Sequence, residues 1–216
     1  MNNCFEKYKN IHKGKSAVLF GTGPSVNEYN DIYNLVKIGS NEIVYKPYIM
    51  DYYFIGDAGN SHRGFNSDRL AYMDYTPNIA KFYRTTTRDI KGMPSGLKDG
   101  YYYSVTDKVR SGGMLYSDIT QGLGMYATIS LEALQFSLYT GVKNIYLVGH
   151  DCDYTDGSFY DKDNAKLEYN RYMLNAWKVA QSWVEKNYPE SFIGIINPIK
   201  LDIFPECGYD DIKENR

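Results

Sequence analysis

The sequence predicts an α/β fold in which a mainly parallel sheet has helices on both faces. The first observation is a short apolar run at residues 16–20 that ends in a glycine-rich loop, which is typical of a strand followed by a helix. The second is a long apolar segment at 125–139 that ends at Gly141 and is followed by an apolar run at 143–149. A helix, a glycine and a buried strand in this order form half of a βαβ unit, so both strands are expected in one sheet.

The other elements of the first part of the chain follow in order. Residues 1–15 are polar and are expected to form a short helix or arm. A helix fits residues 31–35, and a turn followed by a second strand fits residues 37–45. An aromatic-rich strand at 51–55 then ends in glycine and polar residues.

The middle segment, residues 61–116, has the weakest pattern. A short strand fits 80–84, but glycine-rich stretches surround it and no helical period is sustained. We therefore expect one domain over residues 1–216, with an irregular insertion or lid at 61–116. The pattern returns with a long helix at 167–186 and a final strand at 192–198.

Length and composition set the class of protein. A net charge of −2 over 216 residues gives no basic surface for nucleic acid or for an anionic membrane. No apolar run approaches the roughly 20 residues of a membrane span, and the polar N-terminus does not fit a signal peptide, so a cytoplasmic location is expected.

The 3 cysteines are far apart and are expected to be reduced and structural. The 23 tyrosines fit a ligand cleft with polar edges, or else a compositional bias.

The loop after the first strand, Gly21-Thr22-Gly23-Pro24-Ser25, is the first candidate ligand site. Its glycines allow positive φ and close approach of the backbone, and the following helix would direct free N–H groups at an anion. Ser25 and Glu28 have the spacing of an N-cap and its capping-box partner. We expect a nucleotide phosphate to bind here, and a Gly23→Val change to abolish binding and leave the fold intact. The alternative is a plain turn between a strand and a helix.

Polar residues also follow two other strands. Asp57 comes shortly after the strand that ends at Ile55, and His150 and Asp151 come after the strand that ends at Val148. Because the carboxyl ends of parallel strands lie at one edge of a sheet, we expect both ends to converge on a single cleft with the glycine-rich loop.

The candidate general bases are Asp57, His62, His150 and Asp151. The two aspartates are favoured, because burial would raise a carboxyl pKa toward the working pH. Either histidine has the ordinary pKa of a base near neutral pH, or else is a hydrogen-bonded structural residue.

Two further patterns follow the strand at 143–149. Asp151 and Asp153 form an Asp-x-Asp pattern, in which carboxylates and a diphosphate together bind a divalent cation. Magnesium is therefore the alternative to the favoured expectation, which is no metal and no cofactor. Tyr154 and Tyr160 flank a loop around Gly157, where phenol groups would stabilise charge on a departing phosphate or simply pack the loop.

Several of these motifs together resemble a known group. The loop at 21–25, the loop centred on Gly122, the segment 141–151 and Gly157-Ser158-Phe159-Tyr160 are similar to those of bacterial sialyltransferases of the Campylobacter type. They equally resemble a wider set with that fold, which includes an archaeal pterin diphosphokinase and flagellar-glycosylation accessory proteins. The resemblance covers the first loop and about residues 115–200.

The resemblance implies a Rossmann-like sheet that binds a CMP-linked sugar donor, with a glycan acceptor as the second partner. The residues it implies are Thr22, Gly23 and Ser25 at the donor phosphate, Asn41 and Asp57 near the nucleotide and sugar, Gln121 and Gly122 at the base or ribose, and Tyr160 at the leaving phosphate. The chain departs from that family in two places. Asp57 replaces an asparagine, and residues 168–172, where the family has its histidine base, contain no histidine.

Two classes of function remain open. The first is a glycosyltransferase that uses a nucleotide-activated sugar, with a pterin-type diphosphokinase using ATP and Mg²⁺ as its enzymatic variant. The second is an accessory protein that binds a nucleotide without turnover. The missing histidine favours the accessory protein, and the polar strand ends favour the enzyme. A homo-oligomer and a monomer are both consistent with the sequence.

Overall fold

The computed structural model describes residues 4–56, 79–85, 100–105, 115–120, 122–124, 127–153, 155, 157 and 167–215. The first elements are η1 (Glu6–Tyr8), β1 (Ser16–Phe20), η2 (Pro24–Glu28), β2 (Val36–Ser40), η3 (Asn41–Tyr45) and β3 (Tyr52–Ile55), where η denotes a 3₁₀-helix. The later elements are β4 (Ala80–Thr85), β5 (Gly100–Ser104), α2 (Ile129–Tyr139), β6 (Asn144–Val148), α3 (Leu167–Asn187), β7 (Phe192–Ile196) and η6 (Tyr209–Asp211).

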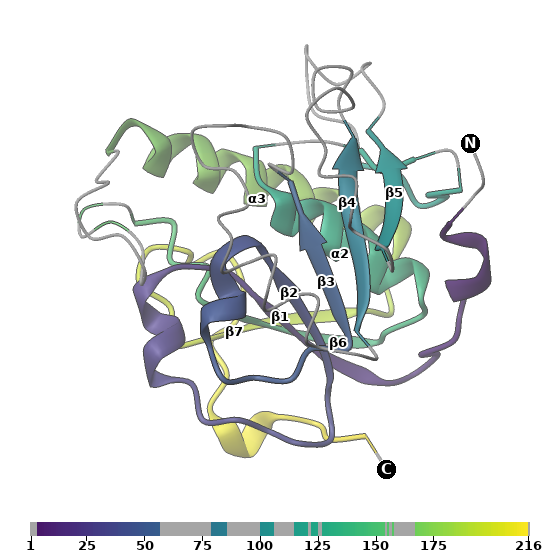
Figure 1. The fold of residues 1–216 in the computed structure, drawn as a ribbon. Coiled ribbons are helices and arrows are strands. Elements are labelled where there is room, and N and C mark those ends of the chain that lie inside the picture. The colour runs from purple at the N-terminus through teal and green to yellow at the C-terminus, as the bar shows by residue number, and fades with distance from the viewer. Residues whose placement is uncertain are drawn as a thin grey trace.

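Within the described residues, seven strands form one sheet in the order β5-β4-β3-β2-β1-β6-β7, and all neighbouring pairs are parallel (Figure 1). The chain first runs outward from β1 to β5. It then crosses back through α2 and adds β6 on the other side of β1. The strand order therefore reverses between β1 and β6, and ligands of open α/β sheets bind outside the carboxyl ends at such a reversal. The predicted α/β fold with a parallel sheet is confirmed.

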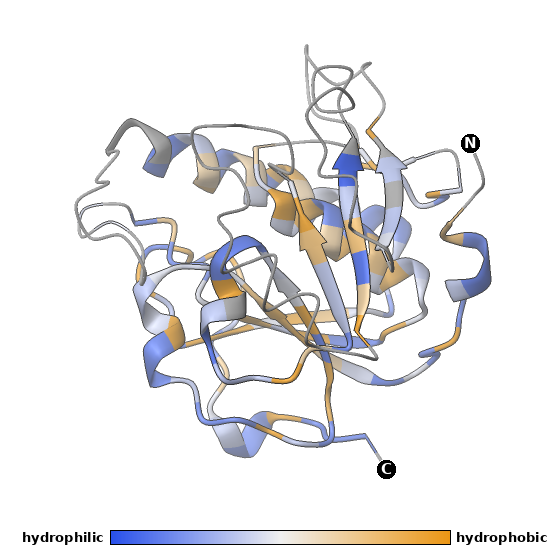
Figure 2. Ribbon diagram, viewed as in Figure 1, coloured by the Kyte–Doolittle hydropathy of each residue, from blue (hydrophilic) through white to orange (hydrophobic). Residues whose placement is uncertain are grey.

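The two faces of the sheet are covered differently. Helices α2 and α3 pack on one face, in an apolar cluster that includes Leu19, Phe54, Phe136 and Trp177. The opposite face carries the shorter helices η2 and η3 and the C-terminal segment with η6, around a second apolar cluster. Successive strand residues alternate between the clusters, as the period of two requires. Figure 2 shows this apolar character along β3 and on α2.

Helix α2 is buried along its whole length, from Ile129 to Tyr139. It begins after Thr128, whose hydroxyl oxygen accepts a hydrogen bond from the Ser130 N–H, and it is followed by Gly141 with φ +85°. The helix was expected from residue 125, and the expected role of Gly141 after its last turn is confirmed. None of the described helices combines the length and apolar character needed to span a bilayer.

Two expected elements in the first half are wrong. Residues 31–35 are not helical, because the chain leaves η2 at Tyr29 in an extended conformation and does not re-enter a helix. The second strand was expected within 37–45 but ends at Ser40. The next residue, Asn41, has φ +47°, which takes the backbone out of the extended region and into η3.

The middle segment 61–116 contributes two strands to the main sheet. β4 pairs with β3 through Tyr83 and Ile55, and β5, which was not expected, pairs with β4. Gly100, the first residue of β5, lies against the ring of Tyr83. A Cβ atom at this position would overlap that ring, which explains why the residue is a glycine. Residues 80–85 and 100–104 are therefore part of the sheet and not of an insertion. A lid stays a prediction for residues outside the described ranges.

The side chain of Asn215 binds both backbone groups of Ser16, the first residue of β1. Its Oδ1 accepts from the Ser16 N–H at 2.6 Å, and its Nδ2 donates to the Ser16 carbonyl at 3.0 Å. An Asn215→Ala change leaves both buried backbone groups without this partner, so we expect a loss of about 1–3 kcal/mol in the free energy of unfolding by urea. Asn34→Ala, which removes an exposed contact to Glu214, is the control and should cost less than about 0.5 kcal/mol. Equal losses would contradict this role of Asn215.

Candidate functional site

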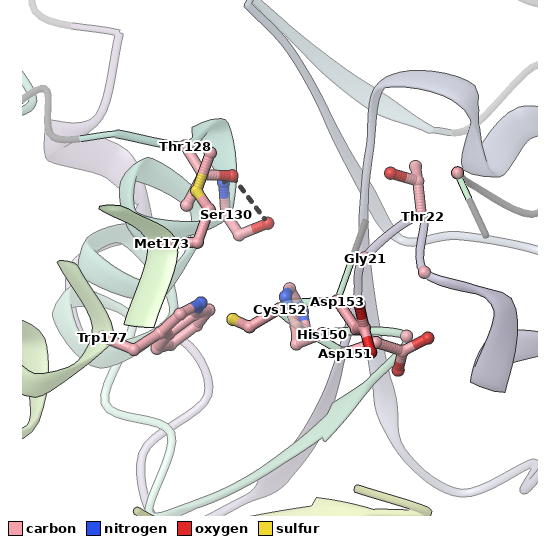
Figure 3. Close-up of a pocket in the computed structure, with 13 residues that line it drawn as sticks. Gly21, Thr22, Thr128, Ser130, His150, Asp151, Cys152, Asp153, Met173 and Trp177 are labelled. Atoms are coloured by element: carbon pink, nitrogen blue, oxygen red, sulfur yellow. Dashed lines mark hydrogen bonds between the residues drawn. The ribbon is translucent and has the colours of Figure 1, made fainter. Parts of the chain in front are cut away.

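A pocket opens at the carboxyl ends of β1 and β6, where the strand order reverses (Figure 3). The space between its walls, counted together with its open mouth, is about 450 Å³. Four segments line it: the loop after β1, the start of α2, the loop after β6, and one side of α3. The lining residues are Gly21, Thr22, Gly23, Thr128, Ser130, Gly149, His150, Asp151, Cys152, Asp153, Gly157, Met173 and Trp177.

The glycines of the first loop allow two backbone segments to approach each other. A Cβ atom on Gly21 would overlap the carbonyl oxygen of Gly149, and one on Gly23 would lie 2.5 Å from Oδ2 of Asp151. Neither has positive φ, and Gly23 has φ −69°. The expectation of positive φ is therefore wrong. A Gly23→Val side chain would overlap the Asp151 carboxylate, so the geometry opposes the prediction that this variant keeps the fold intact.

The carboxylate of Asp151 lies at the start of η2. Its Oδ2 accepts from the Ser25 N–H at 2.9 Å, and its Oδ1 accepts from the Ser25 hydroxyl. The capping box predicted for Ser25 and Glu28 is wrong: the N-cap of η2 is Gly23, and the Ser25 hydroxyl donates to Asp151, whose carboxylate also accepts from the Ser25 N–H. An internal anion thus occupies the position at which a phosphate was expected.

The N–H groups of both glycines in this loop also have partners inside the protein. The Gly21 N–H donates to the Val148 carbonyl and the Gly23 N–H donates to the Gly149 carbonyl, both at 2.8 Å. These bonds extend the β1–β6 pairing beyond the strands. Phosphate binding by Gly21, Gly23 and Ser25 therefore stays a prediction that requires these donors to change partners.

His150 is buried and holds the loop after β6 against β1. Its Nε2 lies 3.1 Å from the carbonyl oxygen of Leu19, so the ring donates to that carbonyl, and its edge packs against Trp177 with ring centroids 5.1 Å apart. Burial lowers the pKa of His150 to about 4, so the imidazole is neutral at neutral pH. This geometry favours the structural role for His150 over that of a general base.

The two aspartates of the Asp-x-Asp pattern have opposite environments. Burial raises the pKa of the Asp151 carboxyl, and the hydrogen bonds from Ser25 oppose this shift. Asp153 is ionised, because its contact with Lys200, at 2.8 Å, and its bonds with Thr155 lower its pKa to about 2. Both carboxylates thus have partners already. Among the described residues, no group of at least three His, Cys, Asp or Glu side chains is arranged to hold a metal, and magnesium stays a prediction.

The remaining predicted residues fall into three groups. Thr22 lines the pocket, and Pro24 begins η2. Asn41 and Gly122 lie outside the pocket lining: Oδ1 of Asn41 accepts from the Gly56 N–H at 3.2 Å, and the Gly122 N–H donates to the Ile119 carbonyl. The predicted residues outside the described ranges are Asp57, His62, Gln121, Tyr154 and Tyr160. The carboxyl ends of β1 and β6 do converge on the pocket, as expected, whereas the described end of β3, Ile55 and Gly56, is not among the lining residues.

The pocket also contains residues that the sequence did not indicate as functional. Thr128 and Ser130 come from the first turn of α2, and Met173 and Trp177 come from α3. A threonine directly before an apolar helix is an N-cap signal, and it marks one helix terminus. No comparable signal distinguishes Met173 and Trp177 from other apolar positions of α3, because their place in the pocket depends on how α3 packs.

Comparisons with known proteins identify the fold. No protein-family model and no curated protein matches the sequence. Solved structures of the sialyltransferase CstII do match the structure. A complex with a trisaccharide acceptor and CMP has 12% identity and a TM-score of 0.54 over 94% of this chain and 91% of that one. A Campylobacter jejuni complex with CMP has 13% identity and a TM-score of 0.56 over the same shares. A complex with CMP-3FNeuAc has 13% identity and a TM-score of 0.52, again over 94% and 91%. This chain therefore has the CstII fold.

Replacing Asp151 tests its contact with Ser25. Asp151→Ala leaves a buried N–H and a buried hydroxyl without their acceptor, so we expect a loss of about 1–3 kcal/mol in the free energy of unfolding. Asp151→Asn keeps an oxygen for the Ser25 N–H and is expected to lose clearly less. Urea unfolding at pH 7 measures both variants. If the alanine variant were as stable as the parent, the contact would not support the fold.

The buried neutral His150 predicts a dependence of stability on pH. The pKa falls from 6.5 to about 4 on folding, so between these values the unfolded chain takes up a proton that the folded chain does not. Stability is complete above pH 6.5 and declines as the pH falls to about 4, by up to about 3 kcal/mol from this group. We expect His150→Gln, which keeps a donor for the Leu19 carbonyl, to flatten this decline in urea unfolding between pH 7 and 4. An unchanged slope would contradict the prediction.

Proposed function

We propose that this protein is a glycosyltransferase that takes a sugar from a nucleotide-activated donor, with a CMP-linked donor favoured, and transfers it to a glycan acceptor. One observation carries the proposal. The pocket lies at the strand reversal of a fold shared with sialyltransferase structures that contain CMP. Open α/β sheets bind nucleotides at this reversal.

We assign the donor phosphate to the first turn of α2 in preference to the start of η2. The N–H of Ser25 in η2 already binds the carboxylate of Asp151. Helix α2 is 11 residues long and directs its N-terminus at the pocket, where Thr128 and Ser130 add hydroxyl groups. The positive end of a helix dipole favours an anion, and the N–H groups of Ser130 and Leu131 are bonded to oxygens of Thr128 and not to a carboxylate. No lysine or arginine is among the lining residues that the structure describes, so the helix and the hydroxyls supply the attraction.

Apolar groups of the pocket suit the less polar part of the donor. Figure 3 shows Met173 and Trp177 of α3 on the same side as Thr128 and Ser130, with the sulfur of Cys152 directed toward Trp177. Ligand pockets combine apolar side chains with a few polar groups that fix the orientation of the ligand. The donor thus fits with its phosphate at the N-terminus of α2 and an apolar edge against Met173 and Trp177.

The general base is assigned to Asp57, which stays a prediction outside the described residues. His150 donates to a carbonyl and is neutral, and both oxygens of Asp151 accept from Ser25. A residue that holds the fold in this way is a poor proton acceptor for a substrate. We therefore regard Asp151 as a residue that shapes the pocket and expect transfer to be slow.

A nucleotide-binding protein without turnover is the second candidate. The observation that favours it is the engagement of both His150 and Asp151 in contacts within the protein. The diphosphokinase alternative requires Asp151 and Asp153 to share a magnesium ion, whereas Asp153 contacts Lys200 and Thr155. It is the weakest of the three.

Thermal shift and calorimetry with CMP test the proposal, with CDP, UDP, GDP and ATP as comparison nucleotides. A ligand that binds the folded state raises the melting temperature, and we expect the largest shift with CMP. Ser130→Ala should weaken CMP binding at least fivefold, because it removes a hydroxyl at the proposed phosphate position. Ser137→Ala, on the same helix but outside the pocket and bonded to the Ala133 carbonyl, is the matched control and should bind like the parent.

Release of CMP from a CMP-linked sugar then separates the two candidates. Release that depends on an added glycan acceptor supports the transferase. CMP binding without any release supports the accessory protein. No stabilisation by any of the nucleotides would overturn both.

A further inference from the structure

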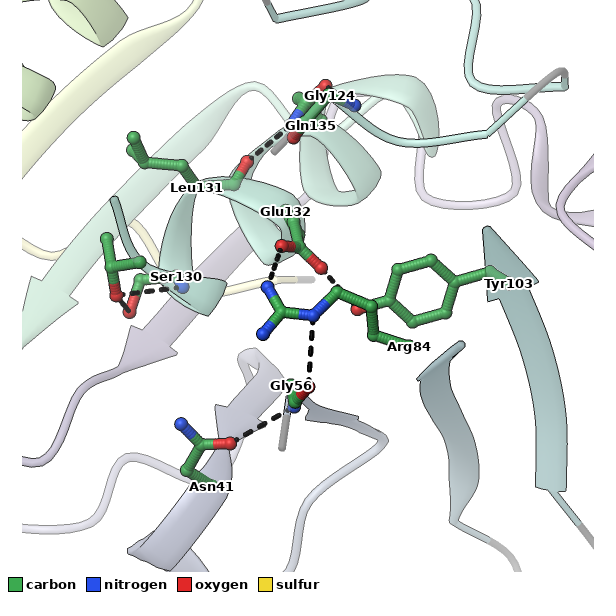
Figure 4. A network of polar contacts seen from close by, with 10 residues as sticks. Asn41, Gly56, Arg84, Tyr103, Gly124, Ser130, Leu131, Glu132 and Gln135 are labelled. Atoms are coloured by element: carbon green, nitrogen blue, oxygen red, sulfur yellow. Dashed lines mark hydrogen bonds and ion pairs between the residues drawn. The ribbon is translucent and has the colours of Figure 1, made fainter. Parts of the chain in front are cut away.

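A buried polar network joins the carboxyl ends of β3, β4 and β5 to α2 (Figure 4). Arg84, near the end of β4, donates from Nε to the carbonyl of Gly56 at 3.0 Å and from Nη1 to Oε1 of Glu132 at 2.8 Å. Tyr103 of β5 donates its hydroxyl to the other oxygen of Glu132. The Glu132 side chain is fully buried and that of Arg84 is 15% exposed. One guanidinium group therefore ties a strand end to the first turn of a helix.

The energetics of this pair point away from a purely stabilising role. Two buried charges lose their hydration, and their attraction offsets that loss only with good geometry, so well-packed apolar residues are often equally stable in such a place. The tyrosine stays a donor, because burial and the adjacent Glu132 carboxylate raise the pKa of Tyr103. Apolar residues would not reproduce the directed hydrogen bonds of Arg84. Its planar guanidinium group holds two acceptors at set angles.

The two acceptors of Arg84, the Gly56 carbonyl and the Glu132 carboxylate, lie close to residues that line the pocket. Gly56 is held on both sides, since its N–H donates to Asn41 and its carbonyl accepts from Arg84. A Cβ atom on Gly56 would lie 3.4 Å from Cδ1 of Ile129, so the end of β3 lies close to the first residue of α2. Ile129 lies between Thr128 and Ser130, which line the pocket.

We propose that Arg84 and Glu132 are positioning residues for the pocket: they fix the first turn of α2, and with it Thr128 and Ser130, against the end of β3. They act through these groups and make no contact with the donor themselves. The ligand-binding part of the proposal rests on the proposed function. The structural part does not, because it concerns the order of the first turn in the free protein.

Two variants and one control test the positioning role. Arg84→Lys keeps the charge beside Glu132 but cannot hold both acceptors at fixed angles. The triple variant Arg84→Met, Tyr103→Phe, Glu132→Leu removes all the polar groups and replaces them with apolar ones. Ser137→Ala is the control on the same helix. Each protein is examined by urea unfolding, by amide hydrogen exchange at Gly56 and Leu131, and by calorimetry with CMP.

We expect both variants to fold, with at least tenfold faster exchange at Gly56 and Leu131 than the control and at least tenfold weaker CMP binding. Unchanged local exchange in Arg84→Lys would overturn the proposal, whether or not the triple variant folds. Faster exchange with unchanged CMP affinity would also overturn it, because the position of the turn would then not matter to the ligand. If the parent itself does not bind CMP, the proposed function fails, and the exchange rates alone decide whether Arg84 orders the turn.

Discussion

The close contact between the loops after β1 and β6 is the constraint on which the rest of the site depends. Two glycines in the first loop leave room for the Gly149 carbonyl and the Asp151 carboxylate, and Ser25 then binds that carboxylate through its N–H and hydroxyl. The Asp151 carboxylate and the two donors of Ser25 depend on each other. A buried carboxylate without hydrogen-bond donors, or buried donors without an acceptor, would lower the stability of the fold. This contact sets the separation of the two strand ends and hence the floor of the pocket.

This contact also changes which groups are available for chemistry. The start of η2 has its anion within the chain, and the neutral ring of His150 is held by the Leu19 carbonyl. Asp151 and His150, two of the residues that the sequence indicates as catalytic, are therefore part of the architecture. Among the described residues that line the pocket, Thr22, Thr128 and Ser130 supply hydroxyl groups, and those of Thr128 and Ser130 are bonded to each other and not to a carboxylate.

Helix α2 organises the other side of the pocket through its buried polar residues. Glu132 binds Arg84 and Tyr103 toward the strands, and Gln135, one turn later, binds the backbone of Gly124 and the Tyr116 N–H. Apolar burial is non-directional, whereas these hydrogen bonds have direction. The hydrogen bonds of Glu132 and Gln135 therefore fix the position of α2, and of its N-terminus, relative to the sheet.

Apolar period and glycine positions are local signals, and they predict the α/β class, the parallel strands at each end of the chain, the helix after residue 125 and the meeting of the β1 and β6 ends. They also indicate the residues around Gly23 and Asp151. The roles of these residues are visible only in the folded structure. Whether a glycine serves a ligand or a neighbouring loop, and whether Asp151 is free or bound, depends on contacts between residues 126 positions apart. Pattern along the chain carries no information on such pairs, since their geometry exists only once the sheet has brought them together.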